Sequence, residues 1–292
     1  MPDISIALLA VIPLALVELA RASRWRVLFG EQRPSYVVCL RALVSGQVTN
    51  ALSPVRGGEA VRLAVLAAQG GAVVPGAASL AGVKAIDAIC LATIAIAVAG
   101  TGVLEQPSWA FLGGAAVLVG GIVVAFAGPR LRDLLERNQI TRKLRLASLV
   151  DVAQAVGDPA VLIHVLLTTA AVWLVGLAAN GVILASVGVM PSLDLMARII
   201  VAGYLVSLLP SLPVQIGTFE AAVTAALVSA GVPLNQAITA SVSLHVCQLI
   251  KLLVLFGVST LLTLRSSQSK PSPAVLPLWL LRPDKAMRRS SN

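Results

Sequence analysis

Charged residues are scarce in this sequence. Asp, Glu, Lys and Arg make up 12% of the 292 residues, whereas 58% are hydrophobic. A soluble domain usually contains about 25% charged residues. The chain therefore lacks the polar surface that a water-soluble globule needs, and its composition predicts a membrane protein.

Cysteine and histidine are also rare, and familiar enzyme motifs are absent. The three cysteines lie in apolar segments without paired spacing, which predicts neither a disulfide nor a metal site. There is no hydrolase elbow, nucleotide-binding loop or zinc-protease motif, so we expect no cofactor. The net charge of +9 is better explained by basic loops beside anionic lipid than by nucleic acid.

Long apolar runs fill much of the chain. They are Ile4–Ala20, Val73–Gly100, Trp109–Ala127, Leu162–Val189 and Ala237–Leu264. Crossing a bilayer as a helix takes roughly 18–20 residues, whereas strands usually end within about 10. No basic residue precedes the first run, so we interpret it as a retained helix rather than a cleaved signal peptide. The predicted fold class is all-α, a polytopic integral membrane protein.

Three basic clusters orient the predicted helices. They lie within residues 21–33, 130–145 and 265–289. Basic loops favour the cytoplasmic side, which predicts an inner-membrane protein with its N-terminus outside and its C-terminus in the cytoplasm. Successive clusters must then be separated by an even number of crossings.

An even number results if one stretch in each half turns back. In the first half this stretch is Tyr36–Leu52, so we predict a re-entrant helical hairpin over residues 36–68, broken at Pro54–Gly58. In the second half, Leu195–Leu212 and Ile216–Ala230 form the second predicted hairpin. Non-helical backbone at membrane depth must be sheltered by protein or a cavity, so two breaks predict a polar centre.

The two halves also share an order of features. Pro, Gly, Glu, a short helix, Gly, Pro and a long helix with charged residues occur twice, which predicts inverted repeats of the kind found in transporters. We predict a transmembrane domain over residues 1–265, with repeats at about 1–128 and 159–265 joined by a basic amphipathic linker at about 129–158. Residues 266–292 are predicted to be a mobile basic cytoplasmic tail.

Ionisable residues inside these segments are the candidates for function, because each costs roughly 2.5–3.5 kcal/mol to insert. They are Arg41, Arg56, Glu59, Arg62, Lys84, Asp87, Glu220, His245 and Lys251, and all of them except Arg41 and Lys251 are predicted to bind substrate. Arg56 and Arg62, with free backbone N–H groups at the first break, suit a phosphate. Lys84 and Asp87 are spaced to pair on one helix face.

The two glutamates and the histidine among these candidates also have a purely structural interpretation. Glu59 and Glu220 each fall in the first turn of a returning helix, where they either cap the helix or orient a cationic group. His245 either packs in a helix interface or forms a polar stripe with Ser241 and Gln248.

Several motifs resemble the lysylphosphatidylglycerol synthase transmembrane region, a flippase-like family, over residues 4–264. They are Arg24-Trp25-Arg26, the stretch from Asn50 through Pro54-Val-Arg56-Gly57-Gly58-Glu59 to Arg62, Lys84-Ala-Ile-Asp87, and the stretch from Pro210 to Glu220. Ala85 and His245 stand where many members have arginine. The resemblance implies a domain that moves a phospholipid or polyprenyl-phosphate-type amphiphile between leaflets, and it adds Asn50 to the substrate-binding residues.

Two alternatives remain open beside a transporter. One is an integral-membrane enzyme acting on a lipid-linked substrate, with His245 and Asp87 as acid and base. The other is an accessory protein of a glycosyltransferase. No aminoacyl transferase domain follows the last helix, so we expect no enzyme activity of that kind. The expected partners are membrane lipids and anionic lipid headgroups, and a homodimer is left open.

Overall fold

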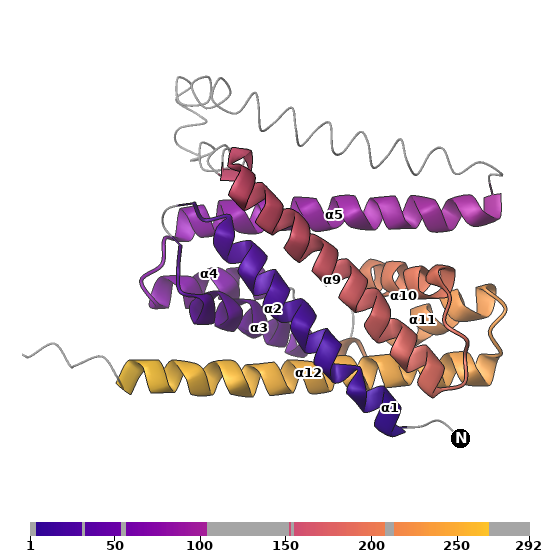
Figure 1. Cartoon of the computed structure of the whole chain (residues 1–292). Coiled ribbons are helices and arrows are strands. Elements are labelled where there is room, and N and C mark those ends of the chain that lie inside the picture. Colours follow the sequence, from indigo (N-terminus) through magenta and orange to yellow (C-terminus); the bar gives the residue numbers. More distant parts are fainter. Residues whose placement is uncertain are drawn as a thin grey trace, which may run out of the picture.

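Helices form all the regular structure in the described part of the chain. The computed structural model describes residues 4–30, 33–53, 57–103, 152, 155–207 and 213–268 (Figure 1). No strand occurs among these residues, so the all-α prediction is confirmed. The predictions for Trp109–Ala127, for the basic linker up to residue 151 and for the tail from residue 269 onward lie outside the described residues.

Four long helical segments dominate the structure. They are α1 and α2 together (Ile4–Leu9 and Val11–Val27), α5 (Val73–Val103), α9 (Pro159–Ser186) and α12 (Leu234–Gln268). Each contains a segment long and apolar enough to cross a membrane. Large apolar side chains also point outward from them, as on Leu167 and Leu253. The chain is a polytopic α-helical membrane protein.

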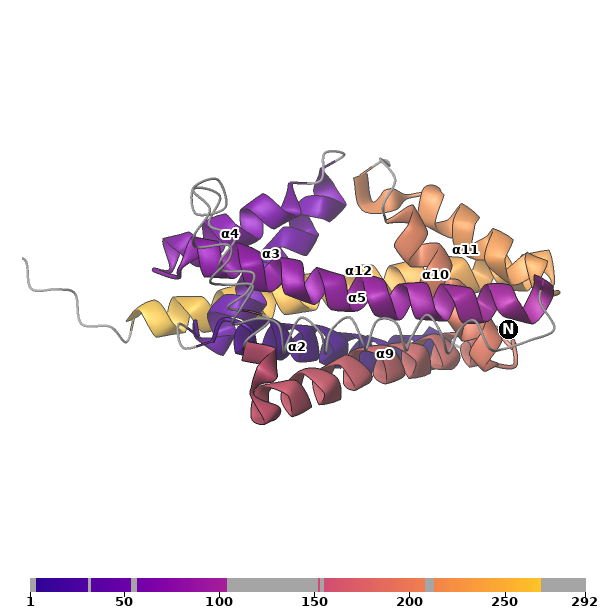
Figure 2. The same cartoon turned by 90° about the horizontal axis from the view of Figure 1, so that it is seen from above.

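Two pairs of short helices lie between the long ones. The first pair is α3 (Tyr36–Leu52) with α4 (Gly58–Ala68); the second is α10 (Leu193–Val206) with α11 (Thr218–Ser229), preceded by the 3₁₀ turn η1 (Pro213–Gln215). They contain 17, 11, 14 and 12 residues, fewer than the roughly 20 that span a bilayer. Figure 2 shows the inner ends of the two pairs facing each other near the middle of the molecule.

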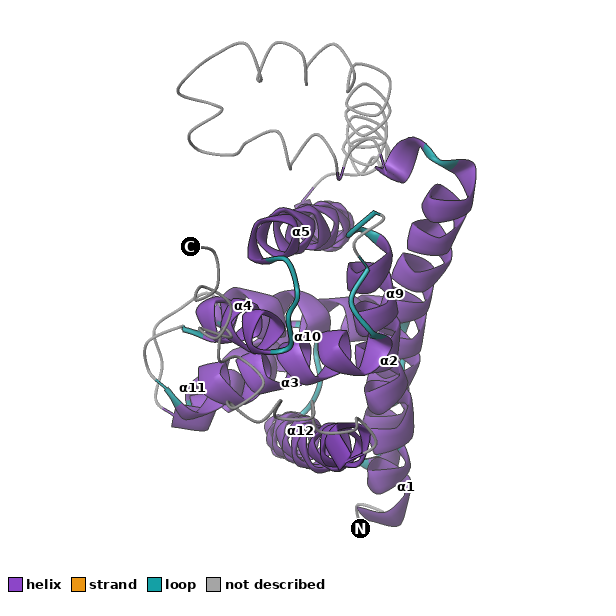
Figure 3. Cartoon of the chain, turned by 90° about the vertical axis from the view of Figure 1, so that its left-hand side faces the viewer, coloured by secondary structure: helices purple, strands orange, loops and turns teal. Residues whose placement is uncertain are grey.

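The chain therefore repeats one order twice, a long helix, a pair of short helices and another long helix. The corresponding long helices run in opposite directions in Figure 1, α2 against α9 and α5 against α12. Viewed along α5 and α12, the short helices α3, α4 and α10 lie between these two long helices (Figure 3).

Matching local signals begin and end the short helices in both halves. The Ser35 and Ser192 hydroxyls cap α3 and α10 by accepting the backbone N–H groups of Val38 and Leu195. Gly70 and Gly231 end α4 and α11 with φ values of 74° and 86°, a left-handed conformation that glycine adopts without steric cost.

The first break lies where the sequence predicts it, because α3 ends at Leu52 and α4 begins at Gly58. In the second half α10 ends at Val206, whereas the sequence predicts a helix as far as Leu212. The prediction for the first helix was also too short. It ended this helix at Ala20, but α2 continues to Val27.

The longer first helix has a physical cause. Arg21, Arg24 and Arg26 lie inside α2 rather than in a loop after it, since each finds a partner there. Arg26, for example, donates to the Pro34 carbonyl oxygen. Placing these three arginines in a loop after the first helix was therefore wrong.

Two apolar clusters meet in the middle of α2 and α12. Leu14 and Cys247 pack in the cluster of the second half, whereas Ala22 and Leu252 pack in that of the first half. Glu18 and Lys251 lie at the change from one cluster to the other, on facing helices.

Candidate functional site

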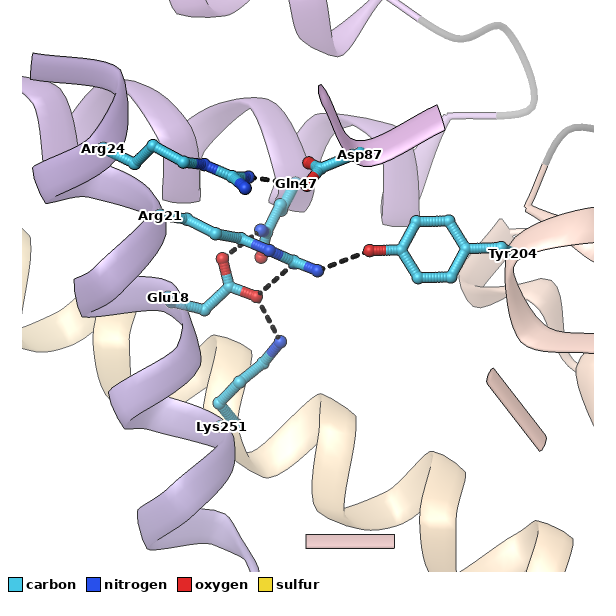
Figure 4. Close-up of polar contacts among 7 residues, drawn as sticks. All are labelled: Glu18, Arg21, Arg24, Gln47, Asp87, Tyr204 and Lys251. Carbon is cyan, nitrogen blue, oxygen red and sulfur yellow. Dashed lines mark hydrogen bonds and ion pairs between the residues drawn. The ribbon is translucent and has the colours of Figure 1, made fainter. Parts of the chain in front are cut away.

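A buried carboxylate lies at the centre of the molecule. Glu18 on α2 is 1% exposed. Its Oε1 atom accepts hydrogen bonds from Arg21 and from Lys251 of α12, both at 3.0 Å, and its Oε2 atom accepts one from Gln47 of α3 at 2.6 Å (Figure 4). A buried charge is stable only when it is paired and hydrogen-bonded, and these three donors meet that condition.

Arg21 extends this network to the second half of the chain. Its second terminal nitrogen donates to the Tyr204 hydroxyl of α10 at 2.6 Å. The Tyr204 ring in turn stacks on Trp173 of α9, with 5.7 Å between the ring centroids. We call Glu18, Arg21, Gln47, Tyr204 and Lys251 the central cluster. With two cations and one carboxylate, its formal charge is +1.

A cavity of about 280 Å³ opens beside the central cluster. Both short-helix pairs line it, together with α2 and α12. The lining residues are Glu18, Arg21, Gln47, Asn50, Ala51, Ser207, Val214, Gln215, Phe219, His245, Gln248, Leu249, Lys251 and Leu252. We call it the central cavity. A smaller cavity of about 90 Å³ shares Glu18, Arg21, Gln248 and Lys251 with it, so the ion pairs lie between the two spaces.

A second ion pair lies further along α2. Arg24 is fully buried and donates to Asp87 of α5 at 2.7 Å and to the Thr169 hydroxyl of α9 at 3.1 Å. The predicted pairing of Lys84 with Asp87 was wrong, because each finds its partner on another helix. Asp87 is the counter-ion of a buried arginine that sequence reasoning had placed outside the helix.

Glu59 connects the first short pair to α5. Its carboxylate accepts from Lys84 at 2.5 Å and lies 3.7 Å from Arg62. Arg62 in turn lies across the α3–α4 interface, where a Cβ on Gly46 would meet its side chain at 2.6 Å. Glu59 therefore balances two cations, Arg62 one turn further along α4 and Lys84 on α5.

Glu220 makes the matching contact in the second half. One oxygen accepts the Gly217 backbone N–H at 2.8 Å and the other lies 2.6 Å from His245 Nδ1. Glu220 thus both caps α11 and orients a side chain. His245 also packs on the Phe219 ring, with centroids 4.9 Å apart, and lines the central cavity.

The structure brings two predicted site residues to the central cavity, Asn50 and His245. Asn50 also accepts the Gly58 backbone N–H at 2.8 Å, which holds the two sides of the first break together. The other described candidates, Glu59, Arg62, Lys84, Asp87 and Glu220, form the pairs described above and do not line the cavity. Arg56 lies outside the described residues.

Sequence reasoning missed the residues of the central cluster except Lys251, which it noted only as an ionisable residue. Glu18 lies inside the first apolar run, three residues before Arg21. That spacing places both on one helix face and is the signal that could have identified the pair. Among the described residues, no group of three or more His, Cys, Asp or Glu side chains could hold a metal ion.

One comparison with known proteins gave a match. The model of the family described as the lysylphosphatidylglycerol synthase TM region matches residues 3–257. Comparison with curated proteins and with solved structures gave no match. The matched region contains both short-helix pairs, the central cluster and every residue that lines the central cavity.

Proposed function

This chain belongs to the family of lysylphosphatidylglycerol synthase transmembrane regions, and we propose that it moves a phosphate-bearing amphiphile between membrane leaflets. Membership in this family relates the protein to lipid handling. The proposed cargo is a phospholipid or a polyprenyl phosphate, and the proposed headgroup site is the central cavity.

The charge of the central cavity is the observation that carries this proposal. Arg21 and Lys251 line it against the single carboxylate of Glu18. Guanidinium and ammonium groups are the usual protein donors to phosphate, and their bonds to it strengthen where water is excluded. A space with excess positive charge inside a membrane favours an anionic headgroup over a cationic one.

The size of the cavity fits a headgroup rather than a whole lipid. Pockets that enclose drug-sized ligands hold about 300–1,000 Å³. The central cavity, at about 280 Å³, is close to the lower limit. A phosphate with a small substituent fits this volume, while the hydrocarbon chains of the cargo stay in the surrounding lipid.

The helix arrangement supports transport by exchange between two sides. Broken helices that meet near the midplane, within inverted repeats, are common in secondary transporters. Here the short pairs face each other, line one cavity and belong to halves whose long helices run in opposite directions. We infer that α3–α4 and α10–α11 are re-entrant hairpins, one from each side.

The exposed basic residues support the proposed orientation. Arg33 follows α2 and Arg265 lies in the last turns of α12, and both are exposed. Figure 1 places the C-terminal ends of α2 and α12 at the same end of the molecule. This end is the proposed cytoplasmic side of an inner membrane, with the N-terminus at the opposite face.

Transport of a labelled lipid by purified protein tests the proposal. Protein reconstituted in vesicles should expose fluorescent phosphatidylglycerol from the inner leaflet to a quencher outside. Arg21→Gln should slow this movement by about 10- to 100-fold, since a hydrogen bond to a charged group contributes about 1.5–3 kcal/mol. Arg198→Gln is the matched control, because Arg198 pairs with Asp194 on α10 and does not line the cavity. Wild-type movement no faster than in protein-free vesicles would reject the function.

The His245–Glu220 pair favours one alternative, an enzyme acting on a lipid-linked phosphate. A histidine oriented by a carboxylate and facing a cavity is a common general base. Pure protein would then convert a labelled lipid phosphate, and His245→Gln would abolish turnover. Lipid movement without turnover would favour the transporter.

A further inference from the structure

In the central cluster, the carboxylate of Glu18 neutralises part of the positive charge of Arg21 and Lys251. Glu18 Oε1 receives both Arg21 and Lys251 at 3.0 Å, and this one atom therefore occupies the point where the two cations converge. All three side chains line the central cavity. A phosphate oxygen entering from the cavity can occupy the same point only by taking the place of the carboxylate oxygen.

We propose that an incoming phosphate displaces Glu18 from Arg21 and Lys251, and that the displaced carboxylate takes up one proton as the phosphate binds. This inference rests on the proposed function. It assigns phosphate binding to Arg21 and Lys251, the role of their counter-ion in the empty site to Glu18, and the driving force to a proton gradient. The ligand class is a phosphate monoester or diester.

Proton uptake follows from what remains around the displaced carboxylate. Both cations now face the phosphate, and a second negative charge stands beside Glu18. Burial and a neighbouring like charge both favour the neutral form of a carboxyl group. Gln47 still donates to Oε2, so the proton binds at Oε1. The proton is taken from the buffered solvent on the side where the lipid enters, and it is released to the solvent on the side where the phosphate leaves and Glu18 pairs again.

The other charged and titratable groups near Glu18 do not supply a substitute partner. Tyr204 on α10 and His245 on α12 hydrogen-bond to Arg21 and Glu220 respectively, and Arg24 is held by Asp87 of α5. Arg62 on α4 is paired with Glu59. Helices α3 and α9 line the two cavities only with uncharged side chains, among them Gln47, which already donates to Glu18.

This exchange couples headgroup binding to a proton gradient. The lipid binds more tightly on the acidic side of the membrane and leaves more readily on the alkaline side. When one proton accompanies each phosphate, the affinity falls by up to about tenfold per pH unit as pH rises.

Calorimetric titration tests the exchange directly. Wild-type protein in detergent is titrated with dihexanoyl-phosphatidylglycerol in buffers of different ionisation enthalpy, which counts the protons taken up. We expect about one proton per lipid bound for wild type, by the same linkage. Glu18→Gln should bind with no proton uptake and with an affinity that does not change with pH. Asp194→Asn, which removes a carboxylate outside the cavity, should behave as wild type.

The outcomes separate this inference from the proposed function. Wild-type binding without proton uptake, or uptake that persists in Glu18→Gln, overturns the exchange, while lipid movement in vesicles would still support a transporter. Neither binding nor movement by wild type overturns both. If Glu18→Gln fails to fold, Glu18→Gln/Lys251→Met removes one acid and one base together and should bind weakly, again without proton uptake.

Discussion

In each half of the chain, a glutamate in the first turn of the returning short helix contacts a base 25 residues further on. Glu59 contacts Lys84 in the first half, and Glu220 contacts His245 in the second. The two contacts occupy the same position in their halves, but the groups around the two glutamates differ in charge. The first half adds Arg62 and is cationic, whereas the second carries a carboxylate beside a group that is charged only when protonated.

The two halves therefore share the position of the glutamate contact but differ in the side chain that the glutamate meets. Gly70 and Gly231 stand at the same separation from their glutamates, and both end their helices in the left-handed conformation. What changed is the side chain opposite the glutamate. Only the second half sends it to the central cavity, because His245 lines that space and Lys84 does not.

The largest predicted effect concerns the centre that both halves share. Glu18→Ala leaves Arg21 and Lys251 without their buried partner and should lower the free energy of unfolding by about 3–5 kcal/mol. Thermal unfolding in detergent, followed by tryptophan fluorescence, measures the loss. Asp194→Asn breaks a more exposed pair and should cost less than about 1 kcal/mol. Equal melting points for the two variants would contradict a shared centre.

The two breaks should respond differently to an added methyl group. A Cβ at Gly58 would collide with the Gly46 backbone carbonyl and the Asn50 amide, so Gly58→Ala should cost about 1–3 kcal/mol by forcing α3 and α4 apart. Gly217 has open space around it but a φ of 81°, so Gly217→Ala should cost about 1–2 kcal/mol from backbone strain alone.

The rate of lipid movement should distinguish these two glycine variants more clearly than their free energies of unfolding do. Gly58→Ala moves Asn50, which lines the central cavity, and should slow lipid movement in vesicles. Gly217→Ala leaves the packing of the first pair unchanged. If Gly217→Ala slowed movement as much as Gly58→Ala, the tight approach of α3 to α4 would not be the relevant difference.

The two glutamates offer a smaller contrast. Glu59→Gln leaves two cations, Arg62 and Lys84, without their carboxylate, whereas Glu220→Gln affects only the contact with His245. We expect Glu59→Gln to be less stable by about 1 kcal/mol, within the range of a charged hydrogen bond in a partly exposed site. Denaturant titration of both variants measures this difference, and the reverse order would show that the cap on Gly217 matters more than the charge.

The smallest expected effect tests the identity of the base. His245→Arg places a permanent cation beside Glu220. Lipid movement at neutral pH should stay within about threefold of wild type, equivalent to less than 1 kcal/mol. Loss of movement in His245→Arg would assign the imidazole a role that a cation cannot replace.

Local signals explain which parts of this structure the sequence predicts. The break before Gly58 and the ends at Gly70 and Gly231 follow from residues within one or two turns, and these predictions were sound. The paired glutamates were recognised for the same reason. The glycine and proline pattern carries this information without knowledge of distant contacts.

The central cluster depends instead on distant residues. The positive-inside rule led to the assignment of Arg21 to a loop, because this rule counts basic side chains and does not consider whether a carboxylate pairs with them. The opposing group, Glu18, is held by Lys251, which lies 233 residues away in the chain. Nothing near Glu18 in the sequence indicates that partner, and so the first helix was predicted to end early and its arginines were assigned to a loop after it.

The long separation between Glu18 and Lys251 also has a consequence for biogenesis. At about 5–20 residues per second, the ribosome needs roughly 12–47 seconds to reach the second residue after making the first. During that interval the nascent first helix holds a carboxylate with Arg21 as its neighbour and no lysine. Arrival of α12 completes the network, so a chain that stops short of α12 displays an incompletely satisfied membrane helix.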